Sequence, residues 1–329
     1  MILAFDTSCD DTSVSCFLDK TKYSNVISSQ NEIHKKYGGI MPEVAARKHI
    51  ENIAYLTKEA MLRMDAALRD IDEIAVTVGP GLLPSLLVGV SFAKGLAYAN
   101  KIPISPVNHI EGHIFAPFIE YDIRFPFIAL VISGGHTHIF LVKSVGEYVL
   151  LGKTLDDAVG EAFDKVARLL DAGYPGGPVI DKLSKTGNPY RYSIPKGMEN
   201  KNTLNFSFSG TKTFVKNLVN NASYLSISDK ADIAASFQRA AVDILWKRAY
   251  EACLQTGIKR LAVSGGVSAN SLLREEFAKN AKEYGMELFI PKKELTTDNA
   301  LMIAFAASLK RSPTFDYSSI EANPRLRIY

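Results

Sequence analysis

Residues 127–135 read Phe-Ile-Ala-Leu-Val-Ile-Ser-Gly-Gly, a short apolar run that ends in a glycine-rich turn. An uninterrupted run of this length, closed by turn residues, is typical of a buried strand. The same pattern recurs at residues 74–78, which precede Gly79-Pro80-Gly81, and at residues 261–263, which precede Ser264-Gly265-Gly266. Short buried strands that alternate with helices predict mixed sheets covered by helices, so we expect an α/β fold.

The expected elements fall into two similar halves. In the first half we expect strands at residues 2–6, 13–18, 23–29, 74–78 and 102–107, a long helix after Pro42 and another from Pro84 or Ser85. In the second half we expect strands at residues 127–132, 138–142, 147–153, 261–263 and 288–290, helices at about 156–171 and 229–256, and a last helix capped by Thr297 or Asp298. Gly257 should end the helix at 229–256 as its C-cap. This order resembles the actin-like ATPase fold shared with sugar kinases, in which two duplicated lobes, with mixed sheets flanked by helices, lie around a cleft.

The length of the chain also favours two lobes, because 329 residues exceed the usual size of a single hydrophobic core. We place the N-terminal lobe at residues 1–110 and the C-terminal lobe at residues 111–329. Residues 174–228 are rich in Gly, Pro, Asn, Ser and Lys, and we interpret them as an irregular insertion in the second lobe.

The composition is that of a soluble globular protein, with 47% hydrophobic residues. The net charge of +3 does not indicate nonspecific binding of nucleic acid by bulk charge. Three cysteines are few and odd in number, which suits a reducing compartment and argues against a disulfide framework. We find no signal peptide, and the most apolar stretch, residues 82–99, is interrupted by Lys94. We therefore expect a cytoplasmic protein that does not bind membranes.

His109 and His113 are candidate metal ligands. They lie four residues apart, so a helix would place both imidazoles on one face. Asp298, far downstream, completes a set of two imidazoles and one carboxylate that suits zinc or iron. The alternative is a pair of partly exposed helix histidines without a metal. Glu111 has the wrong offset for the base of a His-Glu-x-x-His protease motif.

Two glycine-rich turns are candidate phosphate contacts. The backbone amides of Ser133-Gly134-Gly135 can surround a phosphate, because glycine lets a ligand approach the chain. An ordinary hairpin turn is the alternative there, since a strand follows directly. Ser264-Gly265-Gly266 lies between a strand and a helix, where amides at a helix N-terminus bind anions. Asp164 and Asp181 could bracket the hydroxyls of a ribose, or could belong to an exposed acidic helix face.

Two further polar segments allow a functional and a plain interpretation. Residues 6–12, Asp-Thr-Ser-Cys-Asp-Asp-Thr, could hold phosphate oxygens or Mg²⁺, or could be a solvated hairpin tip. Residues 34–49 combine the basic Lys35 and Lys36 with an aromatic ring at Tyr37 and the flexible pair Gly38-Gly39. They could contact an RNA backbone and stack a base, or could be a solvated loop and helix end.

Taken together, these segments closely resemble the TsaD family of tRNA threonylcarbamoyladenosine-modifying enzymes, whose archaeal and eukaryotic members are the catalytic subunit of the KEOPS complex. The resemblance covers essentially the whole chain. The motifs that carry it are residues 6–12, HKKYGGIMPEVAARKH at 34–49, GPGL at 79–82, HIEGH at 109–113, SGGHT at 133–137, residues 160–165 and 173–178, FSFSGTKT at 206–213, SGGVSAN at 264–270 and TDNA at 297–300.

This resemblance implies transfer of a threonylcarbamoyl group from threonylcarbamoyl-AMP to N6 of adenosine 37 in tRNAs that read ANN codons. It implies one iron or zinc ion per subunit, held by His109, His113 and Asp298. It also implies a site for the adenylate, or for AMP or ATP, at Val131, Ile132, Ser133, Gly134, Gly135, Asp164, Gly177, Asp181 and Asn270.

Two positions depart from the family pattern. Some archaeal members have a tyrosine metal ligand where this chain has Val131. Many bacterial members carry glutamate where this chain has Asp6 and Asp11. Asp11 is the candidate catalytic residue, on a shorter side chain than the glutamate.

The implied partners are tRNA and one of two protein sets. The archaeal set is a small kinase-like ATPase with a small dimerising subunit, and the bacterial set includes a paralogous protein. Two other functions are open alternatives: a metal-dependent peptidase, for which no general base can be assigned, and a nonenzymatic actin-type scaffold that binds ATP, which would leave the metal pair without a use.

Overall fold

The computed structural model describes residues 1–198, 203–310 and 313–329, and it forms two compact units. Met1–Asp122 and Thr297–Tyr329 form the first unit, and Ile123–Thr296 form the second. This differs from the division at residues 110 and 111, because the end of the chain returns to the first unit. There helix α10 (Ala300–Lys310) packs against the first two strands. Asp298 therefore belongs to the same unit as His109 and His113.

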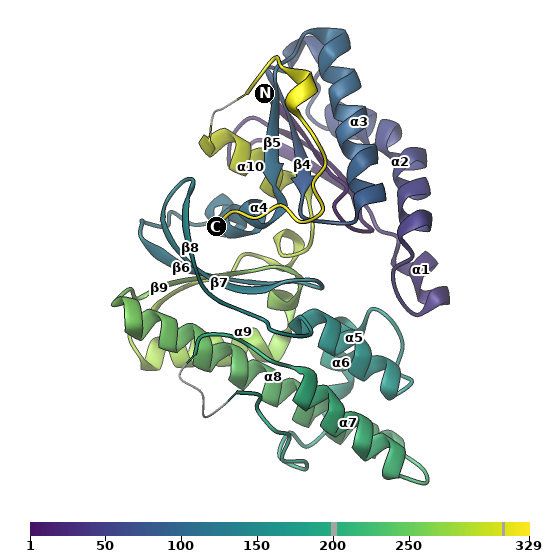
Figure 1. Ribbon diagram of the computed structural model, residues 1–329, viewed down its shortest axis with the longest axis vertical. Coiled ribbons are helices and arrows are strands. Elements are labelled where there is room, and N and C mark those ends of the chain that lie inside the picture. The colour runs from purple at the N-terminus through teal and green to yellow at the C-terminus, as the bar shows by residue number, and fades with distance from the viewer. Residues whose placement is uncertain (199–202, 311–312) are drawn as a thin grey trace. The chain divides into compact units, whose positions relative to one another are not determined.

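The first unit contains a five-stranded sheet in the order β3-β2-β1-β4-β5. Its strands are β1 (Ile2–Asp6), β2 (Thr12–Phe17), β3 (Tyr23–Ser28), β4 (Glu73–Gly79) and β5 (Ile104–Asn108), and its other helices are α1 (Asn31–His34), α2 (Pro42–Leu62), α3 (Leu83–Asn100) and α4 (His109–Phe115). The first three strands pair antiparallel, whereas β4 and β5 run parallel to β1. Helix α2 packs against β2 and β3, and α3 packs against β4 (Figure 1).

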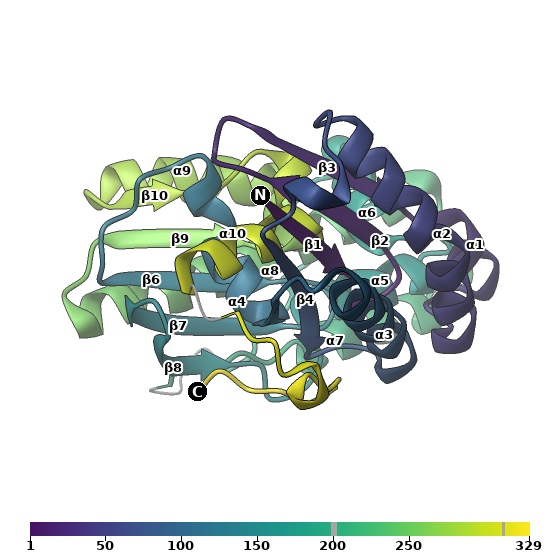
Figure 2. The same cartoon turned by 90° about the horizontal axis from the view of Figure 1, so that it is seen from above.

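The second unit repeats this arrangement with the order β10-β9-β6-β7-β8. Its strands are β6 (Phe127–Ile132), β7 (Thr137–Ser144), β8 (Glu147–Lys153), β9 (Arg260–Ser264) and β10 (Glu287–Phe289), and its helices are α5 (Val159–Leu169), α6 (Gly176–Leu183), α7 (Ser209–Asn221), α8 (Ile227–Thr256) and α9 (Ser271–Glu283). Three antiparallel strands are again followed by two parallel ones (Figure 2). The predicted duplication is therefore confirmed.

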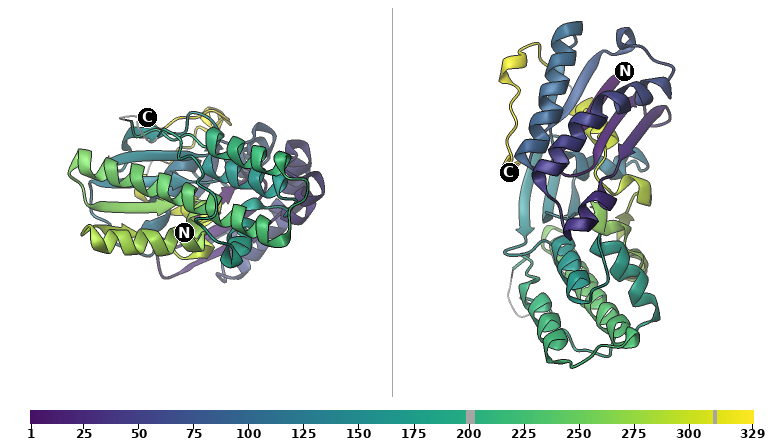
Figure 3. Two further views of the ribbon diagram at one scale, coloured as in Figure 1. Left: turned by 90° about the horizontal axis from the view of Figure 1, so that it is seen from below. Right: turned by 90° about the vertical axis from the view of Figure 1, so that its right-hand side faces the viewer.

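Each unit has its own hydrophobic core, built from alternate residues of its sheet. In the first unit, Leu3 and Phe5 of β1 pack in one cluster with apolar residues of α2 and α3. In the second unit, Ile128, Leu130 and Ile132 of β6 pack with apolar residues of α5, α8 and α9. Strands β1 and β6 are thus anchored in the cores of their units. Figure 3 shows the ribbon of each unit from two further sides. In the described part of the chain, no helix is both long and apolar enough to cross a bilayer.

The prediction of an irregular insertion at residues 174–228 is wrong, because α6 and α7 lie within it. Thr211 and Val215, four residues apart, are buried and give α7 one packed face. Asp156 supplies the N-terminal contacts of α7, accepting hydrogen bonds from the backbone amides of Phe208 (2.8 Å) and Ser209 (3.2 Å). Helix α5 begins at Val159 rather than at about residue 156, and Asp156 lies before it.

Gly265→Ala should strongly destabilise the second unit. Gly265 has φ +91°, and an added Cβ would lie 2.4 Å from the carbonyl oxygen of Ile132. Backbone strain and overpacking together should lower the free energy of unfolding by about 2–4 kcal/mol. Gly266→Ala is the matched control, because nothing lies within 4 Å of its added Cβ. Urea denaturation of both variants measures the difference, and equal stabilities would contradict this account of the turn.

Candidate active site

Helix α4 places the predicted histidine pair on one buried face. The helix begins directly after β5, where the side chain of Asn108 accepts hydrogen bonds from the amides of Ile110 (2.8 Å) and Glu111 (3.4 Å). This N-cap fixes the first turn of the helix and so the direction of both imidazoles. The rings of His109 and His113 lie edge to face with their centroids 4.7 Å apart, and both side chains are buried. The prediction of two histidines on one helical face is confirmed.

Asp298 lies against both histidines. Its Oδ1 is 3.1 Å from Nε2 of His113 and 3.6 Å from Nε2 of His109. The prediction that Asp298 or Thr297 caps the last helix is wrong. Asn299 accepts a hydrogen bond from the amide of Met302 (3.0 Å), which leaves the Asp298 carboxylate directed at the imidazoles.

The other ring nitrogen of His109 has polar neighbours of its own. Nδ1 lies 3.1 Å from Oγ of Ser8 and 3.4 Å from Oδ2 of Asp6. Burial disfavours the charged imidazole, but Asp298 and Asp6 outweigh it and raise the pKa of His109 to about 9. The carboxylates of Asp298 and Asp6 therefore favour a positive charge at this buried position.

The three side chains fit a transition-metal ion. Their ligand atoms all lie within 4.8 Å of one another. Ligands about 2.0–2.1 Å from a tetrahedral ion are about 3.3 Å apart, close to the two distances to Asp298. A carboxylate neighbour on the second nitrogen of a ligating histidine, as Asp6 is for His109, is typical of metal sites, because it fixes the ring and its tautomer. A divalent cation would also supply the positive charge that the carboxylates favour.

Asp11 follows in the turn between β1 and β2 and is partly buried. Burial, followed by repulsion from Asp10, raises the pKa of Asp11 to about 7, and Asp298 acts in the same direction. Burial likewise raises the pKa of Asp10. Oδ1 of Asp11 is buried and has no hydrogen-bond partner among the described residues. A pKa in this range is what a general base at neutral pH requires.

The candidate phosphate turn, Ser133-Gly134-Gly135, connects β6 to β7. The amide of Ser133 donates to the carbonyl of His136 (2.8 Å), so the segment is a tight hairpin turn. The side chains of Val131 and Ile132 are fully buried, which leaves only their backbone available to a ligand. An added Cβ at Gly134 or Gly135 would meet nothing within 4 Å. The turn is thus a hairpin in which the backbone of Gly134 and Gly135 is open to a ligand.

The other predicted adenylate residues form a connected group within the second unit. Oδ1 of Asp164 accepts a hydrogen bond from the amide of Gly176 (2.7 Å), which joins α5 to the start of α6. Oδ1 of Asp181 accepts from the amide (3.2 Å) and the hydroxyl (2.7 Å) of Ser271. Asn270 is buried and caps α9 through the amide of Leu273 (3.0 Å).

Close packing brings this group to the phosphate turn. Gly160, in the first turn of α5, lies so close that a Cβ would be 2.6 Å from the carbonyl oxygen of Ser133. Gly265 approaches the carbonyl of Ile132 from β9, as described above. Gly177, like Gly135, has open space where a side chain would project. The structure therefore collects the predicted adenylate residues at one end of the second sheet.

The segment at residues 34–49 is divided between surface and core. Lys35, Lys36 and Tyr37 are exposed, in a short 3₁₀ helix that ends at Gly38. His34 and His49 are fully buried, so they are not surface contacts for RNA. The exposed part keeps the character expected of a nucleic-acid contact.

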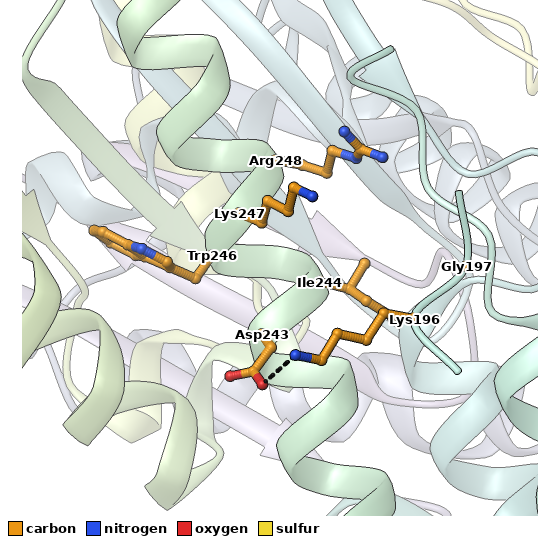
Figure 4. Close-up of a pocket in the computed structure, with 7 residues that line it drawn as sticks. All are labelled: Lys196, Gly197, Asp243, Ile244, Trp246, Lys247 and Arg248. Atoms are coloured by element: carbon orange, nitrogen blue, oxygen red, sulfur yellow. Dashed lines mark ion pairs between the residues drawn. The ribbon is translucent and has the colours of Figure 1, made fainter. Parts of the chain in front are cut away.

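A pocket of about 210 Å³ on helix α8 contains none of the predicted site residues (Figure 4). Two of the cationic side chains that line it are paired with carboxylates. Lys196 lies 3.0 Å from Asp243, and Arg248 lies 2.6 Å from Glu251. Because these two cations are neutralised within the protein and no predicted site residue lies here, we assign no substrate to this pocket.

The contact between Ser8 and Gly81 was not predicted from the sequence. In the structure, a Cβ at Gly81 would lie 2.3 Å from the carbonyl oxygen of Ser8, and the amide of Leu82 donates to that oxygen (2.8 Å). The glycine thus supports the neighbour of His109. Only the unusual glycine spacing hinted at this, because Ser8 lies more than 70 residues away in the chain.

Comparisons with known proteins identify the family of this chain. Residues 21–305 match the family model TsaD, tRNA N6-adenosine threonylcarbamoyltransferase. The chain is 48% identical over 334 residues to the Clostridium botulinum (strain Kyoto / Type A2) protein named tRNA N6-adenosine threonylcarbamoyltransferase, covering 99% of this chain and 97% of the relative. It is 47% identical to the Thermosipho africanus protein of the same name, covering 100% of both.

Solved structures of low sequence identity share the fold. HypF from T. kodakarensis superposes with a TM-score of 0.62 at 16% identity, covering 94% of this chain and 47% of that chain. Component A of (R)-2-hydroxyglutaryl-CoA dehydratase from Acidaminococcus fermentans gives 0.56 at 13% identity, covering 92% and 96%. These likenesses confirm the actin-like fold. The family model and the relatives together show that the chain belongs to the tRNA N6-adenosine threonylcarbamoyltransferase family, TsaD.

Proposed function

We propose that this protein transfers the threonylcarbamoyl group of threonylcarbamoyl-AMP to N6 of adenosine 37 in tRNAs that read ANN codons. The observation that carries the proposal is the convergence of His109, His113 and Asp298, in a chain about half identical to enzymes named for this reaction. The family match does not favour a peptidase or a nonenzymatic scaffold.

In the reaction, a bond forms between N6 of adenosine and the carbamoyl carbon, and the bond from that carbon to the AMP phosphate oxygen breaks. The exocyclic amine of adenine is a poor nucleophile, so much of the rate enhancement must come from positioning. An iron or zinc ion held by His109, His113 and Asp298 would supply Lewis acidity. We assign to Asp11 the acceptance of the proton that N6 loses, because its pKa of about 7 suits a general base at neutral pH.

The leaving adenylate would be held by the second unit. Backbone amides at Gly134 and Gly135 suit the phosphate, with Gly177 giving the ligand room. Asp164, Asp181 and Asn270 already hold the surrounding turns through backbone groups. Their remaining hydrogen-bonding capacity would serve the ribose and base.

The direct test is formation of threonylcarbamoyladenosine on tRNA, with threonylcarbamoyl-AMP and partner proteins supplied. The tRNA is digested to nucleosides, which are separated and identified by mass spectrometry. The matched control is a tRNA with guanosine at position 37. Failure of the complete mixture to modify the adenosine tRNA, with folded protein that contains metal, would overturn the proposal.

A partner protein is part of the proposal. The net charge of +3 gives only a weak electrostatic attraction to tRNA. The relatives named above are bacterial, which favours the paralogous partner over the archaeal set. We expect the isolated chain to modify tRNA poorly at physiological salt and addition of the partner to raise turnover at least about tenfold. Equal turnover with and without the partner would contradict this expectation.

We expect the variant Lys35→Glu/Lys36→Glu to bind tRNA more weakly. Both ammonium groups are exposed, and phosphate contacts release counterions. Loss of two such contacts should make the dependence of log affinity on log salt about 1.8 units shallower. Filter binding across a salt series measures the slope. Lys58→Glu, which changes an exposed residue near the far end of α2, is the control. An unchanged slope in the double variant would show that the segment at Lys35 and Lys36 is a solvated loop that does not contact tRNA.

A further inference from the structure

The turn between β1 and β2, residues 7–11, carries two carboxylates and is held from several sides. We call it the acidic turn. Thr7 donates its hydroxyl to the carbonyl of Ser85 (2.8 Å), and the amide of Leu82 donates to the carbonyl of Ser8 (2.8 Å). These contacts from α3 and the residues before it fix only the first two residues of the turn. Asp10 and Asp11 lie beyond them.

His49, a fully buried residue of α2, contacts the acidic turn at Cys9 and the first residue of β2 at Thr12. Its Nε2 lies 3.0 Å from the carbonyl oxygen of Cys9, and its Nδ1 lies 2.7 Å from Oγ1 of Thr12. A carbonyl oxygen can only accept, so Nε2 carries the hydrogen and Nδ1 accepts from the threonine hydroxyl. One neutral ring thus bridges the two residues that flank Asp10 and Asp11.

This bridge matters because the two carboxylates act near the metal ligands. Asp10 and Asp11 both interact electrostatically with Asp298. Placing two like charges together in a partly buried turn is unfavourable and would drive the turn to open. A rigid pair of hydrogen bonds on either side of the carboxylates opposes that opening.

We infer that His49 is a positioning residue for threonylcarbamoyl transfer, which fixes the acidic turn at Cys9 and Thr12 so that Asp11 keeps one placement. This rests on the proposed function and on the role proposed for Asp11. Burial lowers the pKa of His49, in keeping with a neutral ring that works through its tautomer. Among the described residues, the ring forms hydrogen bonds with Thr12 and Cys9 and with no metal ligand.

The test compares three variants on helix α2. His49→Leu removes both hydrogen bonds and keeps a similar volume. His49→Gln retains an amide N–H that can reach the carbonyl of Cys9. Thr57→Val is the control. Thr57 is buried two turns further along α2, and among the described residues its hydroxyl donates to the carbonyl of Ile53 in its own helix (2.7 Å).

We expect His49→Leu to lower kcat about 10- to 100-fold, as expected for a catalytic group misplaced by about 1 Å, with KM for both substrates and the metal content unchanged. His49→Gln should recover most of the loss, and Thr57→Val should match the wild type. Hydrogen–deuterium exchange should become faster at residues 7–12 in His49→Leu alone. Combining His49→Leu with Thr12→Val should add little, because the two residues share one hydrogen bond.

Three results would overturn the inference: an unchanged kcat in His49→Leu, a parallel loss of metal or adenylate affinity, or a glutamine variant as poor as the leucine variant. If the wild type transfers no threonylcarbamoyl group, the proposed function fails instead. In that case the exchange rates at residues 7–12 still decide whether His49 holds the turn, and unchanged rates in His49→Leu would overturn that too.

Discussion

Replacing both His109 and His113 with alanine is expected to reduce bound iron or zinc from about one ion per chain to nearly none. The two imidazole nitrogens and one carboxylate oxygen of the group lie within 4.8 Å of one another, and a single carboxylate cannot hold a transition metal tightly. Transfer to tRNA should fall at least about 100-fold, since even loss of residues behind the ligands commonly costs 10- to 100-fold. Elemental analysis of purified protein measures the first effect, and the nucleoside assay measures the second.

A matched control separates ligand loss from histidine loss in general. His138→Ala removes another partly buried histidine, from β7 in the second unit, which is outside the metal-ligand group. Burial lowers the pKa of His138 to about 4, so the ring is neutral and its removal leaves no unpaired charge. This variant should keep its metal. Undiminished metal in the double variant, or equal loss in the control, would place the ion elsewhere.

The sheets were predictable because their signals are local. Apolar runs such as residues 127–132 lie in strands buried on both faces, and Gly257, with φ +71°, closes α8 as predicted. Helix α7 was missed because its sequence is polar and its start depends on Asp156, more than 50 residues earlier. The return of α10 to the first unit was missed for the same reason: its first amide donates to Ser13 (2.8 Å), 287 residues away.

The candidate site shows the same division. The spacing of His109 and His113 predicted their shared face, and the family resemblance identified Asp298 as the third ligand. Neither could show that Ser8 and Asp6 flank the ring of His109, because those contacts join residues about 100 positions apart. From the sequence, His49 was expected in a basic surface segment, whereas in the structure it is buried against the acidic turn.

Gly135→Val should weaken binding of AMP or of a threonylcarbamoyl-AMP analogue at least about 100-fold. The turn offers a phosphate only backbone amides, and a branched side chain would occupy the space that the ligand needs. Loss of about two hydrogen bonds to a charged phosphate, each worth about 1.5–3 kcal/mol, exceeds the 2.7 kcal/mol of a 100-fold change. Isothermal titration calorimetry on folded protein measures the affinity.

This variant is informative because the fold itself has room for the new side chain. A Cβ at Gly135 meets nothing within 4 Å, and the residue is not among the glycines with positive φ, so the melting temperature should hold. Gly135→Ala should give a smaller loss of affinity, because its single methyl group fills less of the space. Gly210→Val, which also has open space in the second unit, is the control and should bind normally. An unchanged affinity in Gly135→Val would show that the phosphate is bound elsewhere, since no other part of this turn could compensate for a blocked approach to its backbone.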